Sequence, residues 1–253
     1  MIANSLFSRQ SKAKGFTPHL FRGWGSLNSQ PNRKGAGFTL LELLIVITIL
    51  AILAVIIIFV LNPAETLRKS RDVQRLSDLA TLKNSIALYI TSTTTPYLGN
   101  SSSNATCKTN ATTYASGDLI WYSLPNGTPI TDTTLDGGTT YPLKNQATTP
   151  AGVDGTGWIP VNLGGLSGGS PISNLPIDPT NTISDLANVA LTDLVYRYSC
   201  EATNLTFEIN ANLESTAYTS TDNKESKDGG DNVSLYEMGT GLGLLGDGAS
   251  VQF

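Results

Sequence analysis

The strongest hydrophobic pattern in the chain is an unbroken apolar run, Phe38–Leu61, in which Glu42 is the only charged residue. A helix over these 24 residues would be about 36 Å long at ~1.5 Å per residue. That length is enough to cross a hydrocarbon core of about 30 Å. A secretory signal peptide has a shorter apolar core with small residues after it, whereas here the small residues at 35–37 come first. We therefore expect a retained membrane helix with a removable N-terminal piece; the alternative is an uncleaved anchor.

A second helical pattern follows Asn62 and runs from about Ala64 to Ile90. Pro63 lacks a backbone N–H and predicts a kink or a local break between the two patterns. Apolar residues then recur at three- and four-residue steps, with charged residues between them, which predicts an amphipathic helix. We expect one face to lie on a globular domain and the other face to lie in solvent. The apolar positions are Leu67, Val73, Leu76, Leu79, Leu82, Ile86 and Tyr89.

Beyond residue 91 the helical periodicity disappears, and Thr, Ser, Asn, Gly and Pro dominate. Two apolar runs, Leu194–Cys200 and Leu205–Leu213, lie either side of a short polar stretch and predict an antiparallel hairpin. Val233–Glu237 completes the three best strand candidates, and Leu119–Leu124 and Thr140–Leu143 are weaker ones. We predict an α+β chain, in which a long N-terminal helix with a transmembrane half and an amphipathic half packs on a small antiparallel β-sheet head. The predicted segments are a leader (1–37), a transmembrane and assembly helix (38–61), its amphipathic continuation (62–90) and an exported head (91–253).

Charge is distributed unevenly along the chain. Residues 1–37 contain six lysines and arginines and no acid, which leaves ten basic and twenty acidic residues for the remainder. A basic segment before an apolar helix stays on the cytoplasmic side, so we expect a cytoplasmic leader and an exported head. The acidic remainder argues against nucleic acid as a partner of the mature head.

Residue composition also argues against an enzyme. The single histidine, His19, lies in the predicted leader. A processed chain would therefore lack the base of a Ser-His-Asp or Cys-His site and the usual nitrogen ligand of zinc. Because no other nucleophile–base pair is visible, we predict no catalytic activity.

The two cysteines, Cys107 and Cys200, lie far apart in the sequence. In an exported domain the expected arrangement is one disulfide between them. Such a bond would pin the Thr-rich segment after the second helix to the edge of the sheet. The alternative is two free thiols in a reducing compartment.

Glu42 is unusual because a carboxylate at the centre of a membrane helix costs about 2.5–3.5 kcal/mol, and less near an end. Cleavage after Gly37 would create an ammonium group on Phe38, about 6 Å below Glu42 along the helix axis. That ammonium group would be better placed to pair with Glu42 of a neighbouring copy shifted along the axis. The same helix would then be stable both in lipid and in the core of a helical bundle.

The stretch KGAGFTLLEL, residues 34–43, resembles the class III signal of type IV pilins and type II secretion pseudopilins. The family pattern has Gly before the cut, an aromatic residue after it and Glu as the fifth mature residue, which fall on Gly37, Phe38 and Glu42. The resemblance implies cleavage by a prepilin peptidase and N-methylation of Phe38. It also implies a pilin-like fold and a homopolymeric filament, assembled by a cytoplasmic ATPase and an inner-membrane platform protein. The chain would be a single-pass membrane protein first and a periplasmic or surface filament later.

Two further stretches are similar to major pseudopilins. Residues 175–181, LPIDPTN, resemble their Pro-x-Asp-Pro element, although Thr180-Asn181 stand where that family has Trp-Gly. Thr221–Asn232 resembles their acidic, Gly-rich calcium loop, which implies bound calcium; the alternative is an ordinary solvated turn. The implied calcium ligands are Asp222, Asp228 and Asp231.

The predicted function is therefore a structural subunit of a type IV pilus or of a pseudopilus. The signal sequence is common to both kinds of filament and does not separate them. The alternative function is a membrane-anchored surface binding or adhesion module that does not polymerise.

Overall fold

The computed structural model describes residues 37–109, 117–124, 149–187 and 189–245, and the backbone of three two-residue strands between 134 and 145. Residues 1–36, which make up nearly all of the predicted leader, lie outside the described residues. So do residues 141–143 of the predicted strand Thr140–Leu143. The chain divides into two compact units, Met1–Ile52 and Leu53–Phe253, and each is described by itself.

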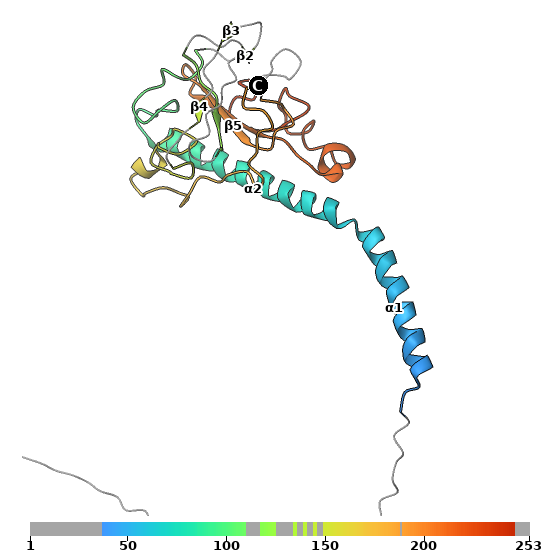
Figure 1. Cartoon of the computed structure of the whole chain (residues 1–253). Helices are drawn as coiled ribbons and strands as arrows, with labels where there is room; N and C mark the ends of the chain where they lie inside the picture. The colour runs from blue at the N-terminus through green and yellow to red at the C-terminus, as the bar shows by residue number, and fades with distance from the viewer. Residues whose placement is uncertain are drawn as a thin grey trace, which may run out of the picture. The chain divides into compact units, whose positions relative to one another are not determined.

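The described part of the first unit is residues 37–52, most of which belong to helix α1, Leu40–Leu61 (Figure 1). Leucine, isoleucine and valine occupy all sides of this helix, and none of its residues is buried within the chain. A helix that is apolar all round normally lies inside a membrane or a larger assembly. An exposed apolar surface of this extent needs lipid or other protein to cover it.

The second unit contains the end of α1 and helix α2, Pro63–Ser92, separated by the single residue Asn62. Asn62 adopts a left-handed conformation, with φ 39° and ψ 73°, which asparagine tolerates better than most residues. Its side chain accepts the N–H of Glu65 at 3.4 Å. Pro63 is the first residue of α2, where its missing N–H costs no hydrogen bond. Asn62 therefore ends one helix, and Pro63 starts the next.

The head contains one main sheet. Its four antiparallel strands, in spatial order, are β1 (Trp121–Tyr122), β5 (Tyr196–Glu201), β6 (Thr206–Ala211) and β7 (Tyr236–Gly239). β4 (Lys144–Asn145) pairs parallel to β1 at the edge, and β2 (Thr134–Leu135) pairs separately with β3 (Thr139–Thr140). The predicted hairpin is confirmed, because β5 and β6 pair in antiparallel register along their whole length. β1 is shorter than its predicted run, and β7 lies later than Val233–Glu237.

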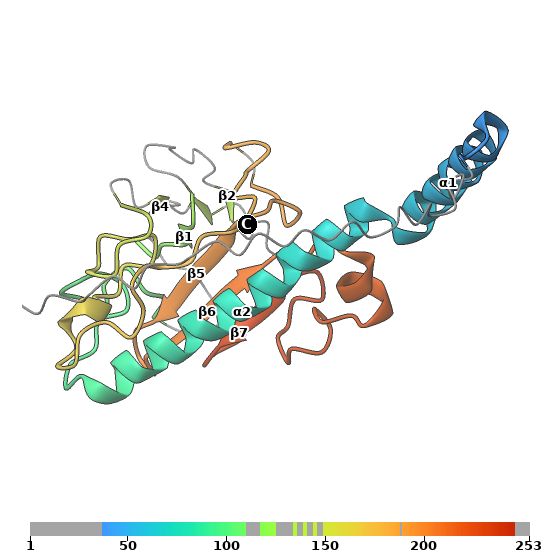
Figure 2. The same cartoon turned by 90° about the horizontal axis from the view of Figure 1, so that it is seen from below.

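Helix α2 lies along one face of this sheet and forms the main core with it (Figure 2). Alternate residues of β5 and β6 point into the core, as the period of a strand requires. The strand residues are Tyr196, Tyr198, Phe207 and Ile209, and the helix contributes Leu79, Leu82, Ile86 and Tyr89. Tyr122, Val195 and Leu235 belong to a second, smaller apolar cluster. The predicted α+β architecture, a long helix on a small antiparallel sheet, is confirmed.

The predicted contact face of α2 is wrong in its first half. Leu67 and Val73, which the apolar periodicity places on the head, are 61% and 49% exposed. Asp72 and Arg75, which were expected in solvent, are fully buried. The reason is that acidic groups and backbone amides of the head bind these charged side chains, so ionic contacts replace apolar packing over this part of α2.

Candidate processing and assembly segment

The predicted cleavage site lies on exposed chain immediately before α1. Gly37 and Phe38 precede the first helical residue, and the Phe38 side chain is 82% exposed. Among the described residues, no atom lies within 4 Å of the position that a Cβ at Gly37 would take. The described residues therefore leave the Gly37–Phe38 bond uncovered, and proteolysis requires an accessible bond.

Glu42 occupies the first turn of α1, where a helix N-terminus favours negative charge. Its backbone N–H donates a hydrogen bond to Thr39 Oγ1 at 3.2 Å. The Thr39 carbonyl accepts the N–H of Leu43 at 3.2 Å, so Thr39 caps the helix. The sequence reasoning did not consider Thr39, although the spacing Thr-x-x-Glu is the signature of a capping box.

The described chain has one helical stretch that is long and apolar enough to cross a membrane, and α1 supplies its apolar part. The 22 residues of α1 correspond to about 33 Å of helix. The hydroxyl of Thr48 donates to the Ile45 carbonyl at 2.8 Å, which satisfies this polar group inside the helix. Because Glu42 is in the first turn of α1, it would lie near one end of a membrane span, where a charge costs less than at the centre.

Arg75 fastens α2 to two separate parts of the head. Its Nε donates to Asp178 Oδ2 at 2.7 Å, and its Nη1 donates to Asp72 Oδ1 at 2.8 Å and to Glu214 Oε1 at 2.6 Å. Arg75 and Asp72 are fully buried, and Asp178 is nearly so. Buried charges persist when they are paired and hydrogen-bonded, as they are here. Asp178 belongs to the LPIDPTN element, so in this chain that aspartate anchors α2.

Further polar contacts extend this junction along the helix. Glu214 also binds Arg71, and hydrogen bonds from Arg71 and Arg75 lower the pKa of Glu214 to about 2. The Asp72 carboxylate accepts the backbone N–H groups of Glu214 and Ser215. These partners lie more than a hundred residues from α2 in the sequence, and for that reason a local pattern does not reveal them.

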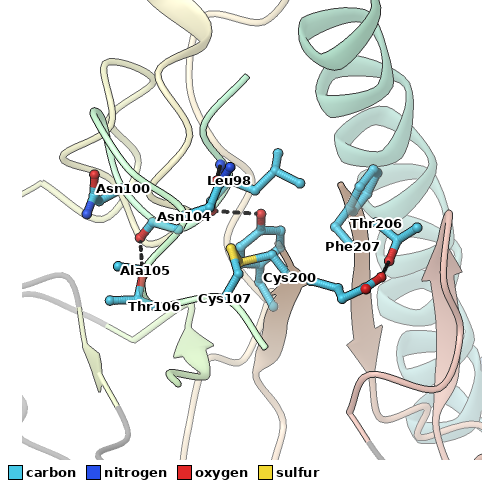
Figure 3. Close-up of a disulfide and its surroundings, with 12 residues drawn as sticks. Leu98, Asn100, Asn104, Ala105, Thr106, Cys107, Cys200, Thr206 and Phe207 are labelled. Carbon is cyan, nitrogen blue, oxygen red and sulfur yellow. Dashed lines mark hydrogen bonds between the residues drawn. A yellow bond between two sulfur atoms is a disulfide. The ribbon is translucent and has the colours of Figure 1, made fainter. Parts of the chain in front are cut away.

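Cys107 and Cys200 form the predicted disulfide, which joins the segment after α2 to strand β5 (Figure 3). Both residues are buried. Backbone hydrogen bonds continue the connection, because Lys108 donates to the Cys200 carbonyl and accepts from Ala202, each at 2.8 Å. The covalent bond therefore fixes the Thr-rich segment against the sheet.

The three aspartates of the predicted calcium loop are not arranged as one ligand set. Asp222 is bound by the ammonium groups of Lys224 and Lys227, at 2.6 and 2.8 Å. The Asp228 carboxylate accepts the backbone N–H groups of Gly230 and Glu237. In the part of the chain that the structure describes, no group of three or more His, Cys, Asp or Glu side chains is positioned to hold a metal. Asp222 and Asp228 thus have other partners, and calcium binding by this loop stays a prediction.

Comparison with known protein families identifies the prokaryotic N-terminal methylation motif at residues 32–58. The match includes Gly37, Phe38 and Glu42 and most of α1. Neither the curated proteins nor the solved structures include a match to this chain. The motif and the single apolar helix of the described chain are consistent with a membrane-anchored precursor. The N-terminal segment of this protein is thus a class III signal, the kind that is characteristic of type IV pilins and pseudopilins.

Proposed function

We propose that this chain is the precursor of a structural, non-enzymatic subunit of a type IV pilus or pseudopilus filament. The observation that carries the proposal is α1, which begins within the methylation motif and whose apolar side chains are exposed. A prepilin peptidase would cut between Gly37 and Phe38 and methylate the new amine. The assembly ATPase and the platform protein of the inner membrane would then move the subunit from the bilayer into the filament.

The composition of α1 suits both environments. In the bilayer, lipid tails cover its side chains, and in a filament the α1 helices of neighbouring copies would cover them. The transfer exchanges one apolar environment for another, so the hydrophobic effect neither opposes nor drives it. Packing between helices and specific polar contacts then decide whether copies associate.

Glu42 is the residue that we expect to supply such a contact. Thr39 binds its backbone N–H, but the carboxylate would still require a positive partner in a dry bundle. The ammonium group of Phe38 on a neighbouring subunit would provide that partner. The pairing would also fix the axial shift between two copies, since it requires residue 38 of one copy to lie level with residue 42 of the other.

The direct test is Glu42→Gln, which keeps the size of the side chain and removes its charge. Thr48→Val is the matched control, because Thr48 is a polar residue of α1 whose hydrogen bond lies within its own helix. We expect both variants to be processed at Phe38, with filaments counted by electron microscopy lost in Glu42→Gln and retained in Thr48→Val. Filaments of wild-type abundance in Glu42→Gln would contradict the proposal. Full surface binding by a monomeric Glu42→Gln protein would instead favour a membrane-anchored adhesion module.

A further inference from the structure

The sheet face that points away from α2 contains buried carboxyl groups. Glu208 on β6 and Glu237 on β7 are fully buried. They alternate along their strands with Phe207, Ile209 and Met238, which pack in the main core, so their side chains point to the opposite face. A buried carboxylate is costly unless hydrogen bonds or a positive charge compensate it. The surroundings of these two residues therefore require an explanation.

Two segments of the chain each hold one of these carboxyls. The segment after β7 donates the N–H groups of Leu244 and Leu245 to Glu208 Oε2, at 2.7 and 3.1 Å. The segment before β7 donates the N–H of Asn232 to Glu237 Oε2 at 3.0 Å. A Cβ at Gly230 would collide with the same Glu237 oxygen, so glycine allows this segment to pack closely against the carboxyl. Both flanks of β7 are thus tied to the sheet through these carboxyls.

The two carboxyls are also close neighbours on this face. In the β6–β7 register Glu208 lies opposite Gly239 and Glu237 lies opposite Asn210, so the two glutamates are diagonal neighbours on adjacent strands. Oε1 of each has no hydrogen-bond donor among the residues that the structure describes. Two ionised carboxylates buried side by side repel each other, so a proton or a metal ion is needed to compensate them. Calcium takes six to eight oxygen ligands, and the described residues do not form an acidic group of the size needed to hold a metal. A proton is the better fit.

We propose that Glu208 and Glu237 share one proton at neutral pH, and that this carboxyl pair clasps the segments on both sides of β7 to the sheet. The pair belongs to β6 and β7 of the head, and neither residue is part of the methylation motif or of α1. The head would contain the carboxyl pair whether or not the protein polymerises, so the inference is independent of the proposed function.

The surrounding charges favour a retained proton. Burial, followed by the interaction of its protonated form with Glu208, raises the pKa of Glu237 to about 10, and burial also raises the pKa of Glu208. The Asp231 carboxylate raises both pKa values further, because it adds negative charge nearby. Two buried cations on neighbouring elements bind backbone carbonyls: Lys108 donates to Leu244 and Arg197 to Ala190. The Asp228 carboxylate is a further acid beside the pair, because it accepts the backbone N–H of Glu237 at 2.7 Å.

The raised pKa values of the two carboxyls determine how the stability of the fold changes with pH. A carboxyl whose pKa is raised in the folded state stabilises the fold fully below its unfolded value of about 4.3, and this stabilisation is lost as the pH rises towards the folded value. Within that window the folded protein holds one more proton than the unfolded protein. The unfolding equilibrium constant should therefore increase about tenfold per pH unit.

The test is urea unfolding of the full chain in detergent at pH 7.5 and pH 9.0, followed by the fluorescence of the buried Trp121 and Trp158. In the wild type, the free energy of unfolding should be lower at pH 9.0 than at pH 7.5. In Glu237→Gln the amide N–H replaces the shared proton, so the fold should persist with little change between the two pH values. Glu208→Gln is a second variant with the same expectation. Asp222→Asn, which removes an exposed acid, should keep the wild-type dependence.

Two results would overturn the proposal. One is a pH dependence in both glutamine variants that equals that of the wild type. The other is a wild-type urea midpoint that rises with added calcium or magnesium and falls with chelator, while both glutamine variants show neither change. That second pattern would mean that a metal ion, rather than a proton, joins the carboxyls.

Discussion

The junction between α2 and the head leads to a quantitative prediction about Arg75. Arg75→Met keeps most of the side-chain volume but removes the guanidinium that binds Asp72, Asp178 and Glu214. Loss of one partner from a buried ion pair costs about 3–5 kcal/mol, because the remaining charge stays buried without compensation. Asp178 keeps the N–H groups of Thr180 and Asn181, and Asp72 keeps those of the segment after β6. We therefore expect the lower end, about 3 kcal/mol.

The assay is urea unfolding of the full chain in detergent at pH 7, with near-ultraviolet circular dichroism as the probe of the packed aromatic core. Arg68→Met is the control, because Arg68 is an exposed cation of the same helix that forms a long ion pair, 4.0 Å, with Glu65. Exposed pairs of this kind contribute less than about 1 kcal/mol. Arg75→Met combined with Asp178→Leu should recover part of the loss, since the second change removes an orphaned charge. If the free energy of unfolding of Arg75→Met equals that of Arg68→Met within error, Arg75 is not the anchor of α2.

Two other predictions concern the stability of the head. Replacement of Cys107 and Cys200 by serine should cost up to about 4–5 kcal/mol in the chain-entropy account, since the bond closes a sequence separation of 93 residues. Reductant should lower the urea midpoint of the wild type towards that of the double variant and leave the variant unchanged; equal midpoints without reductant would contradict this. Burial raises the pKa of Glu225 to about 7, so its stabilising effect is present below about pH 4.3 and is lost as the pH approaches 7. Glu225→Gln should therefore gain stability relative to the wild type between pH 5 and pH 8 in urea titrations, and a constant difference would count against a buried, protonated Glu225.

The sequence predicts those features that depend on neighbouring residues. Local patterns correspond to the observed elements in three places: the apolar run forms α1, and the alternating residues form β5 and β6. The Thr-rich composition begins where α2 ends. The disulfide was predictable because the chain has only two cysteines. The class III signal was predictable because Gly37, Phe38 and Glu42 lie within six consecutive residues.

Features that depend on distant partners were not predictable in the same way. Arg75 has the spacing of a solvent-facing residue, and its burial depends on Asp178, more than a hundred residues away. Glu208 alternates with Phe207 and Ile209, a pattern that is typical of a strand with one wet face, yet every residue of β6 after Thr206 is buried. Its partner, Glu237, lies on a strand whose bounds the apolar pattern misplaced. Charged residues reveal their pairing only when the fold brings the strands and loops together.

The mass of the mature protein, isolated from cells that also express a prepilin peptidase, reports whether the signal is processed. We expect a chain that begins at Phe38 and carries one added methyl group on its N-terminal amine, and we expect Gly37→Val to prevent this processing. A mature protein that retains residues 1–37, or that begins at any residue other than Phe38, would refute processing at this site and with it the proposed filament subunit.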